Sequence, residues 1–92
     1  MPQVFKVGSY IIYFWINEGL PLEPIHVHIA EGKPAENGTK VWITQKGRAL
    51  LADRTSKIPA SKLRIIMEVI EARHEEIEAL WLKKFGEISY YC

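Results

Sequence analysis

The chain has 92 residues, of which 48% are hydrophobic, and its formal net charge is +1 at neutral pH. A hydrophobic fraction this high excludes an intrinsically disordered chain, and a charge this small excludes a strong global field that would attract nucleic acid or a membrane surface. At this length we expect one domain, residues 1–92, that buries roughly 60–65% of the surface exposed by the unfolded chain.

Cysteine usage and hydropathy predict the compartment. The single cysteine, Cys92, cannot form an intrachain disulfide, which favours a reducing environment. The sequence has no signal-peptide pattern and no run of 18 apolar residues. We therefore expect a cytoplasmic protein that does not interact with a membrane.

The first part of the chain, residues 1–57, has the pattern of short β-strands broken by Gly, Pro and Asn. Val4–Val7 and Tyr10–Trp15 are separated by Gly8-Ser9, which predicts a β-hairpin. The second of these runs is β-branched and aromatic throughout, which indicates a strand that is buried on both faces. Further strands are expected at His26–Glu31, Thr39–Thr44 and Arg48–Arg54, the last of which could instead be a helical turn.

Residues 59–86 are predicted to form one long helix. Apolar residues recur there at steps of three and four, which is typical of an amphipathic helix that faces a core. Pro59 suits the first turn, and Gly86 suits a left-handed C-terminal cap. The predicted fold is therefore α+β, with a small antiparallel sheet of four to five strands and one long C-terminal helix packed across one face.

The stretch EPIHVHIAEG, residues 23–32, places two histidines in a predicted strand. Residues i and i+2 of a strand share a face, so His26 and His28 are expected to project together, away from the helix. A third histidine, His74, lies on the apolar stripe of the helix. It is expected to be a histidine at the edge of the core with one hydrogen-bonded nitrogen.

Metal binding is the first interpretation of the histidine pair. Neutral imidazoles on one strand face can both bind Zn²⁺ or a similar divalent ion, which makes His26 and His28 candidate ligands. A third ligand would have to come from His74, Glu31 or Glu23. The helix is expected on the other face of the sheet, which separates His74 from the pair. Apart from such an ion, no cofactor is expected.

Acid–base chemistry is the second interpretation. Imidazoles titrate near neutral pH, so His26 and His28 could serve as base and acid in RNA cleavage through the 2′-hydroxyl. A cation would have to stabilise the phosphorane, and the candidates are Lys40, Lys46, Arg48 and Arg54. In the third interpretation the pair is not catalytic, and it hydrogen-bonds loop carbonyls after Pro24 or lines a protein-binding face. The sequence leaves open whether the protein is an enzyme.

Aromatic residues add one further candidate surface. Tyr10, Tyr13 and Trp15 could form an aromatic face on which nucleic-acid bases stack, although packing under the helix or against a second copy in a homodimer is the more ordinary role. The sequence contains no P-loop, GxGxxG, CxxC, HExxH or GxSxG motif. Nucleotide-binding, redox and common hydrolase classes therefore have no support.

Four blocks of the sequence together resemble the DUF4160 family of small bacterial proteins: MPQVFKVGSYIIYFWINEG, EPIHVHIAEG, VWI and EALWLKKFG. The resemblance covers nearly the whole chain. By this resemblance His26 and His28 match the family's HxH signature, and Glu18 matches the acidic residue before its central loop. The family's signature at the end of its last helix is matched here by Trp81, Phe85 and Gly86.

The chain departs from the family pattern at two places. Pro24-Ile25 stands where the family usually has two prolines, which frees an N–H group just before His26. Extra residues are present around Lys33–Asn37. Ile25 in place of a proline is therefore expected to loosen the approach to His26.

The resemblance implies a biological setting more than a reaction. The family has no known function, and its genes often lie beside those of DUF2442 proteins in an arrangement like toxin–antitoxin modules. The chain could therefore be the toxin of such a module, acting on RNA through His26 and His28 with Lys40 or Arg48 near the phosphate. The alternatives are a non-enzymatic module that pairs with a DUF2442-like protein through its sheet edge or aromatic face, and a metal-binding protein that uses the histidine pair.

Overall fold

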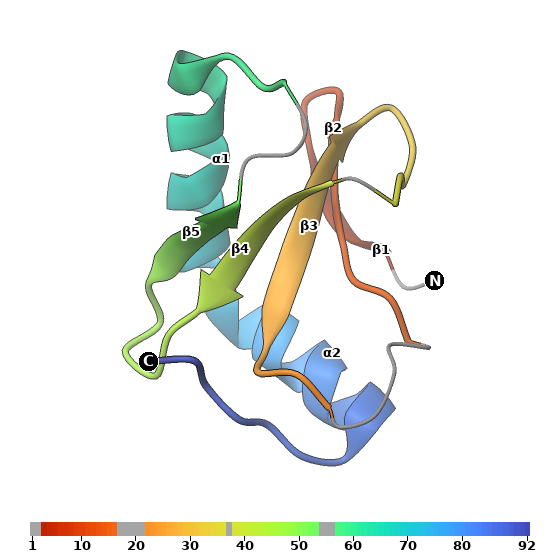
Figure 1. Cartoon of the computed structure of the whole chain (residues 1–92), viewed down its shortest axis with the longest axis vertical. Helices are drawn as coiled ribbons and strands as arrows, with labels where there is room; N and C mark the ends of the chain where they lie inside the picture. Colours follow the sequence, from red (N-terminus) through yellow and green to blue (C-terminus); the bar gives the residue numbers. More distant parts are fainter. Residues whose placement is uncertain (1–2, 17–21, 37, 54–56) are drawn as a thin grey trace.

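The computed structural model describes residues 3–16, 22–36, 38–53 and 57–92, and these contain a sheet and two helices (Figure 1). The strands and helices are β1 (Gln3–Val7), β2 (Tyr10–Tyr13), β3 (His26–Glu31), β4 (Thr39–Ile43), β5 (Ala49–Asp53), α1 (Ala60–Ala72) and α2 (His74–Phe85).

The five strands form one antiparallel sheet in the order β1-β2-β3-β4-β5, so each strand pairs with its neighbours in the sequence. The prediction of a four- to five-stranded antiparallel sheet is confirmed, and β5 shows that Arg48–Arg54 contains a strand. All four residues of β2 are buried, as its uniformly apolar sequence predicts. Gly8, with φ +60°, forms the tight turn between β1 and β2.

Two helices stand where one long helix was expected. The prediction of one helix over residues 59–86 is wrong, because the chain leaves helical geometry at Arg73, where φ is −113° and ψ is 23°. The Arg73 guanidinium lies 4.0 Å from the ring centroid of Phe5 in β1 and pairs with Glu76. The break redirects the chain, so that α1 packs near β5 and α2 reaches β1 on the same face of the sheet (Figure 1). Among the described residues, neither helix is long and apolar enough to cross a membrane.

The main core lies between the sheet and the two helices. It contains side chains from β2, β3 and β4, including Ile12, Val27 and Val41, and a helical stripe formed by Leu63, Ile66, Ile70, Ile77 and Trp81. A smaller cluster lies on the opposite face, where Ile11, Tyr13 and Ala30 are buried and Trp15 packs against them. Tyr10 belongs to the main core, so the prediction that it shares a face with Tyr13 and Trp15 is wrong. The physical reason is that residues three positions apart in a strand point to opposite faces.

A carboxylate of α1 joins the helix layer to the edge of the sheet. Glu71 Oε2 accepts a hydrogen bond of 2.9 Å from the backbone N–H of Ala49 and one of 3.2 Å from Arg48 Nε. These bonds favour the charged form, and the Ala49 N–H is the main reason that the pKa of Glu71 lies below its ordinary value of 4.5. Glu71 therefore fixes the start of β5 against α1.

We expect Glu71→Gln to lower the free energy of unfolding by about 1 kcal/mol at neutral pH, since a charge-assisted hydrogen bond is lost. The folded-state pKa lies below 4.5, so the carboxylate stabilises the fold above pH 4.5, and this contribution disappears as the pH falls through the folded-state pKa. The difference between wild type and variant should therefore shrink in acid. Urea denaturation between pH 3 and pH 7 measures it, with exposed Glu68→Gln as the control.

Candidate functional site

Strand β3 presents its two histidines on the face of the sheet that the helices leave largely uncovered, although Trp81 of α2 reaches the ring of His26. The ring centroids of His26 and His28 are 5.1 Å apart and the ring planes are nearly perpendicular. In the sheet register His28 lies between Tyr13 of β2 and Lys40 of β4, and His26 lies opposite Trp42. The alternation of a strand thus brings the pair together as predicted.

His26 is enclosed. The residue is only 1% exposed, and its Nδ1–H donates a 2.9 Å hydrogen bond to the carbonyl of Pro24. The last residue pair of the β2–β3 ladder is Tyr13 with His28, so no residue of β2 lies opposite His26. The imidazole ring of His26 contacts Trp81 of α2, with 5.4 Å between ring centroids, and Trp42, with 5.7 Å between centroids. Chemistry at His26 on a large substrate would require these covering rings to move.

His28 is half-buried and lies under a turn. Its ring stacks on Tyr13 with 5.6 Å between centroids, and its Nδ1–H points at the Gly38 carbonyl 3.4 Å away. The hydroxyl of Tyr13 donates a 2.5 Å hydrogen bond to the carbonyl of Ala35 and accepts one of 3.1 Å from the Ala35 N–H. Burial raises the pKa of Tyr13. The two hydrogen bonds with Tyr13 therefore hold the turn that contains Ala35 over Tyr13 and beside His28.

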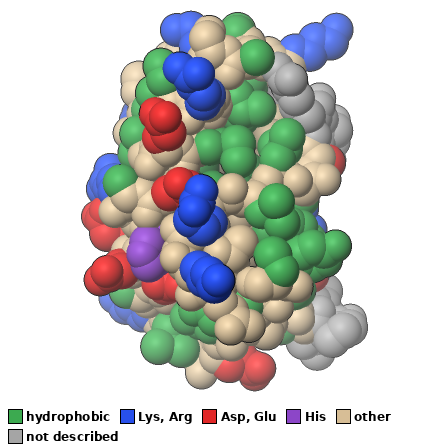
Figure 2. All heavy atoms as spheres, turned by 90° about the vertical axis from the view of Figure 1, so that its left-hand side faces the viewer, with side chains coloured by type: hydrophobic (Ala, Val, Ile, Leu, Met, Phe, Trp, Pro, Cys, Tyr) green, Lys and Arg blue, Asp and Glu red, His purple; other side chains and the backbone are tan. Residues whose placement is uncertain are grey.

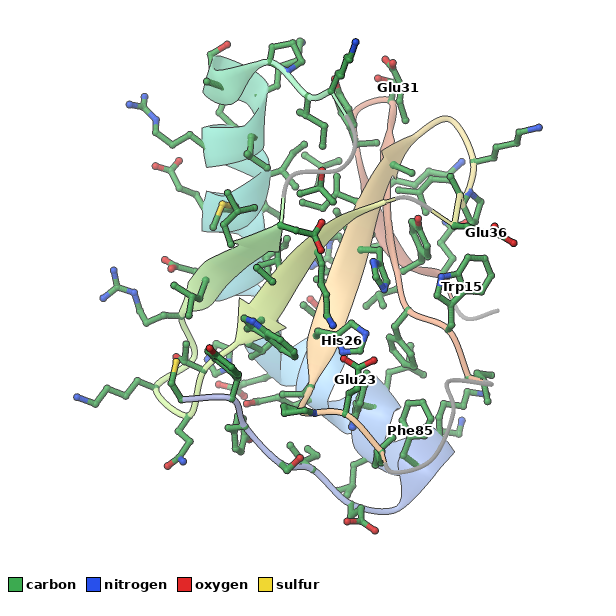
Figure 3. All side chains as sticks on the ribbon, viewed as in Figure 1. Trp15, Glu23, His26, Glu31, Glu36 and Phe85 are labelled. Atoms are coloured by element: carbon green, nitrogen blue, oxygen red, sulfur yellow. The ribbon has the colours of Figure 1, made fainter. Side chains whose placement is uncertain are left out.

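Lys40 is the predicted cation that the structure brings to the histidines. Its Nζ lies 2.6 Å from Glu23 Oε1 and 4.3 Å from the ring centroid of Trp42. Figure 3 shows Glu23 next to His26 at the beginning of β3. Arg48 instead pairs with Glu71 of α1, on the helix side of the sheet.

The other two predicted cations add nothing to the histidine face. Lys46 is exposed in the turn between β4 and β5, and Arg54 lies outside the described residues, as does Glu18 of the family pattern.

The candidate metal ligands do not converge. Glu23 binds Lys40, and Glu31 accepts a hydrogen bond from the hydroxyl of Ser9. His74 lies on α2, where its ring packs over Gly47 and its Nδ1–H donates to Glu78 Oε1 at 3.1 Å. Its position at the edge of the core is the predicted one. The described part of the chain contains no group of three His, Cys, Asp or Glu side chains that could hold a metal ion, so zinc binding stays a prediction.

Six rings form a continuous contact chain along the uncovered face, which we term the aromatic row. Neighbouring ring centroids in it are 4.8 to 5.7 Å apart. The row consists of Trp15, Tyr13, His28, His26, Trp42 and Tyr91. Sequence reasoning missed Trp42, although Trp42 and Lys40 share a face of the predicted fourth strand by simple alternation. It also missed Tyr91, which follows the helix at a position where no periodic pattern indicates its contacts.

Comparison with protein-family models decides the relationship of the chain. The model described as "Domain of unknown function (DUF4160)" matches residues 9–82. The chain belongs to the DUF4160 family. No curated protein and no solved structure matches it. The matched region of this DUF4160 domain contains five members of the aromatic row, whereas Tyr91 lies beyond it.

On the uncovered face of the DUF4160 domain, aromatic rings are more accessible to a ligand than titratable groups are. Of the two histidines, one is buried and the other is half-buried under a turn, and the nearby cation already pairs with a carboxylate. Such a surface can stack planar groups or pack apolar ones. Proton transfer to an external substrate would first require the release of several contacts.

Proposed function

We propose that this DUF4160 domain is a non-enzymatic protein-binding module of a two-gene, toxin–antitoxin-like system. It binds its partner, a DUF2442-like protein, through the face that carries the aromatic row. The observation that carries this proposal is the burial of His26, which leaves the histidine pair as part of a packed aromatic surface. The two-gene setting and the nature of the partner come from the family resemblance.

The composition of this face supports protein contact. Trp15 and Trp42 are partly exposed on this face. Trp and Tyr are enriched where proteins bind each other, because they combine a large apolar area with few rotatable bonds. Leu50 of β5, which is opposite Trp42 in the sheet and 41% exposed, extends the face to the sheet edge. Figure 2 views the molecule from the side of α1 and β5 and shows hydrophobic side chains gathered between charged ones.

A second candidate function is the RNA-acting toxin. It is favoured by one observation, that the histidine rings lie 5.1 Å apart with Lys40 directly across from His28. In this mechanism His26 and His28 act as acid and base, and Lys40 stabilises charge on the phosphate. The mechanism requires that His26 becomes accessible and that Lys40 exchanges Glu23 for the phosphate.

Growth and co-purification distinguish the two functions. The chain and its neighbouring gene product are expressed in a bacterial host, separately and together, as wild type, His28→Ala and Trp42→Ala. For the binding module we expect Trp42→Ala to weaken the complex by about tenfold, the effect of losing an interface residue worth roughly 1.4 kcal/mol. Ile65→Ala, on α1 and 52% exposed, is the control and should leave the complex unchanged.

A different result of the growth experiment would support the RNA-acting toxin. If induction of the wild type alone arrests growth and a folded His28→Ala variant does not, the histidines are catalytic and the binding-module proposal fails. Circular dichroism establishes that each variant is folded.

A further inference from the structure

The segment after α2, residues 87–92, runs from the helix layer back to the sheet. Gly86, with φ +80°, ends α2 in the left-handed conformation and turns the chain. The N–H of Ile25 then donates a 2.8 Å hydrogen bond to the carbonyl of Ser89, and the N–H of Gln45 donates a 3.0 Å bond to the carbonyl of Cys92. Figure 1 shows this segment passing below β3 and reaching the turn between β4 and β5. It is held by main-chain hydrogen bonds, as a bound extended peptide would be.

The two tyrosines of this segment are held differently. Tyr90 is partly buried against the main core, and its hydroxyl donates a 3.1 Å hydrogen bond to Glu78 Oε2. Tyr91 lies flat on Trp42, with 4.8 Å between ring centroids and 4° between ring planes, yet it remains 60% exposed. The contact that Tyr91 makes is therefore specific in geometry but buries little of its surface, so another ring could replace it.

We propose that Trp42 is the platform of a binding subsite for an aromatic side chain carried by an extended segment of the protein partner, and that Tyr91 is its internal occupant. The subsite deepens the proposed function and rests on it as far as the partner is concerned. Tyr91 shows which chemistry the platform accepts, because a tyrosine ring with peptide hydrogen bonds on either side already lies there.

The surroundings of the platform favour a peptide over a nucleotide. Lys40 lies 4.3 Å from the Trp42 ring, but its ammonium group already pairs with Glu23 at 2.6 Å. A phosphate would have to displace that carboxylate. An aromatic side chain needs only the ring face, as Tyr91 does, and leaves the ion pair intact.

Tethering makes Tyr91 a strong competitor for its own platform. A ring held on a short segment acts at an effective concentration on the order of millimolar, which exceeds that of a free ligand in most titrations. A platform that is free in only about one molecule in ten binds an external ring about tenfold more weakly than an empty platform, so removal of Tyr91 should raise that affinity by about tenfold, a factor that corresponds to about 1.4 kcal/mol. Because Tyr91 is largely exposed, its removal should leave the fold intact.

The test uses N-acetyl-tyrosinamide as the probe and the full chain as the receptor. The indole N–H signal of Trp42 is followed by NMR during titration of wild type, Tyr91→Ala and Tyr91→Phe. We expect Tyr91→Ala to bind about tenfold more tightly than wild type, and Tyr91→Phe to behave as wild type because the ring is kept. The double variant Trp42→Ala/Tyr91→Ala is followed through backbone amide signals, and it should lose the increased affinity for N-acetyl-tyrosinamide. Equal affinity of wild type and Tyr91→Ala would overturn the proposal.

The partner is tested separately. If the neighbouring gene product binds, Tyr91→Ala should strengthen that complex as well, and an unchanged complex would place the partner's contact elsewhere and overturn its assignment to this subsite. If the neighbouring gene product binds no variant, the proposed function fails, while the tyrosinamide titration still decides whether the platform binds an aromatic ring.

Discussion

Replacement of Trp81 by alanine is expected to lower the free energy of unfolding by about 3–5 kcal/mol. Trp81 is fully buried and contacts three rings, with centroid distances of 4.9 Å to Phe14, 4.4 Å to Phe85 and 5.4 Å to His26. The cavity would open between α2 and the sheet, where rings from α2, from β3 and from the residue after β2 meet and cannot all move inward. A loss of this size is a large part of the total stability of a small domain, which is typically about 5–15 kcal/mol.

Two further variants show whether the loss comes from the cavity. Leu82→Ala changes the next residue, which is 48% exposed, and should alter stability by less than about 0.5 kcal/mol. Trp81→Phe should be milder than alanine, because the Trp81 Nε1 has no hydrogen-bond partner among the described residues and phenylalanine keeps most of the ring. Urea denaturation followed by far-ultraviolet circular dichroism gives the midpoints. Similar midpoints for Trp81→Ala and Leu82→Ala would contradict the central role of Trp81.

Trp81 also links the fold to the candidate site. Its ring supports His26 from the helix side, while Trp42 contacts His26 along the sheet. The packing around His26 thus borders the main core through Trp81, and loosening that core is expected to expose the histidine. A Trp81→Phe variant that binds the partner less tightly while remaining folded would show that the core positions the aromatic row.

Local patterns explain the success of the strand predictions. The side-chain alternation of β3 and the turn at Gly8 depend on neighbouring residues, so the sequence predicts the hairpin and the common face of His26 and His28. The helix break at Arg73 could not be predicted from such local patterns. The apolar stripe continues on both sides of Arg73, and a one-residue change of backbone direction leaves that periodicity almost unaltered. At the break Arg73 contacts Phe5, nearly 70 residues earlier, and local periodicity cannot indicate such a neighbour.

The candidate site was predictable to the extent that it lies within one strand pair. Lys40 joins the histidines because it is directly opposite His28 in the next strand. The side chain of Arg48 pairs with Glu71, since Arg48 immediately precedes β5 at the edge where α1 packs, and only tertiary structure reveals that neighbour. Tyr91 was not predictable for a similar reason, because its position depends on the path of the segment after α2 across the sheet.

Substitution of Gly38 by alanine is expected to lower the free energy of unfolding by about 1–3 kcal/mol, because it overpacks the site beside the aromatic row. A Cβ atom at this position would lie 2.2 Å from the hydroxyl oxygen of Tyr13 and 3.1 Å from Cβ of His28. The Tyr13 hydroxyl cannot move freely, because Ala35 holds it through both its carbonyl and its N–H. Either the ring or the turn over it must shift, and both changes would disturb His28.

A double-mutant cycle isolates this contact. Tyr13→Phe alone should lower stability by about 1 kcal/mol through loss of the hydrogen bonds to Ala35, but it also removes the oxygen that a new Cβ would meet. Gly38→Ala should therefore be less harmful in the Tyr13→Phe background than in the wild type, and thermal or urea unfolding of the four proteins measures the difference. Effects that add within about 0.5 kcal/mol would mean that the two sites do not interact. A clear coupling would establish that Gly38 is required so that the turn can close over Tyr13 and hold His28 in the aromatic row.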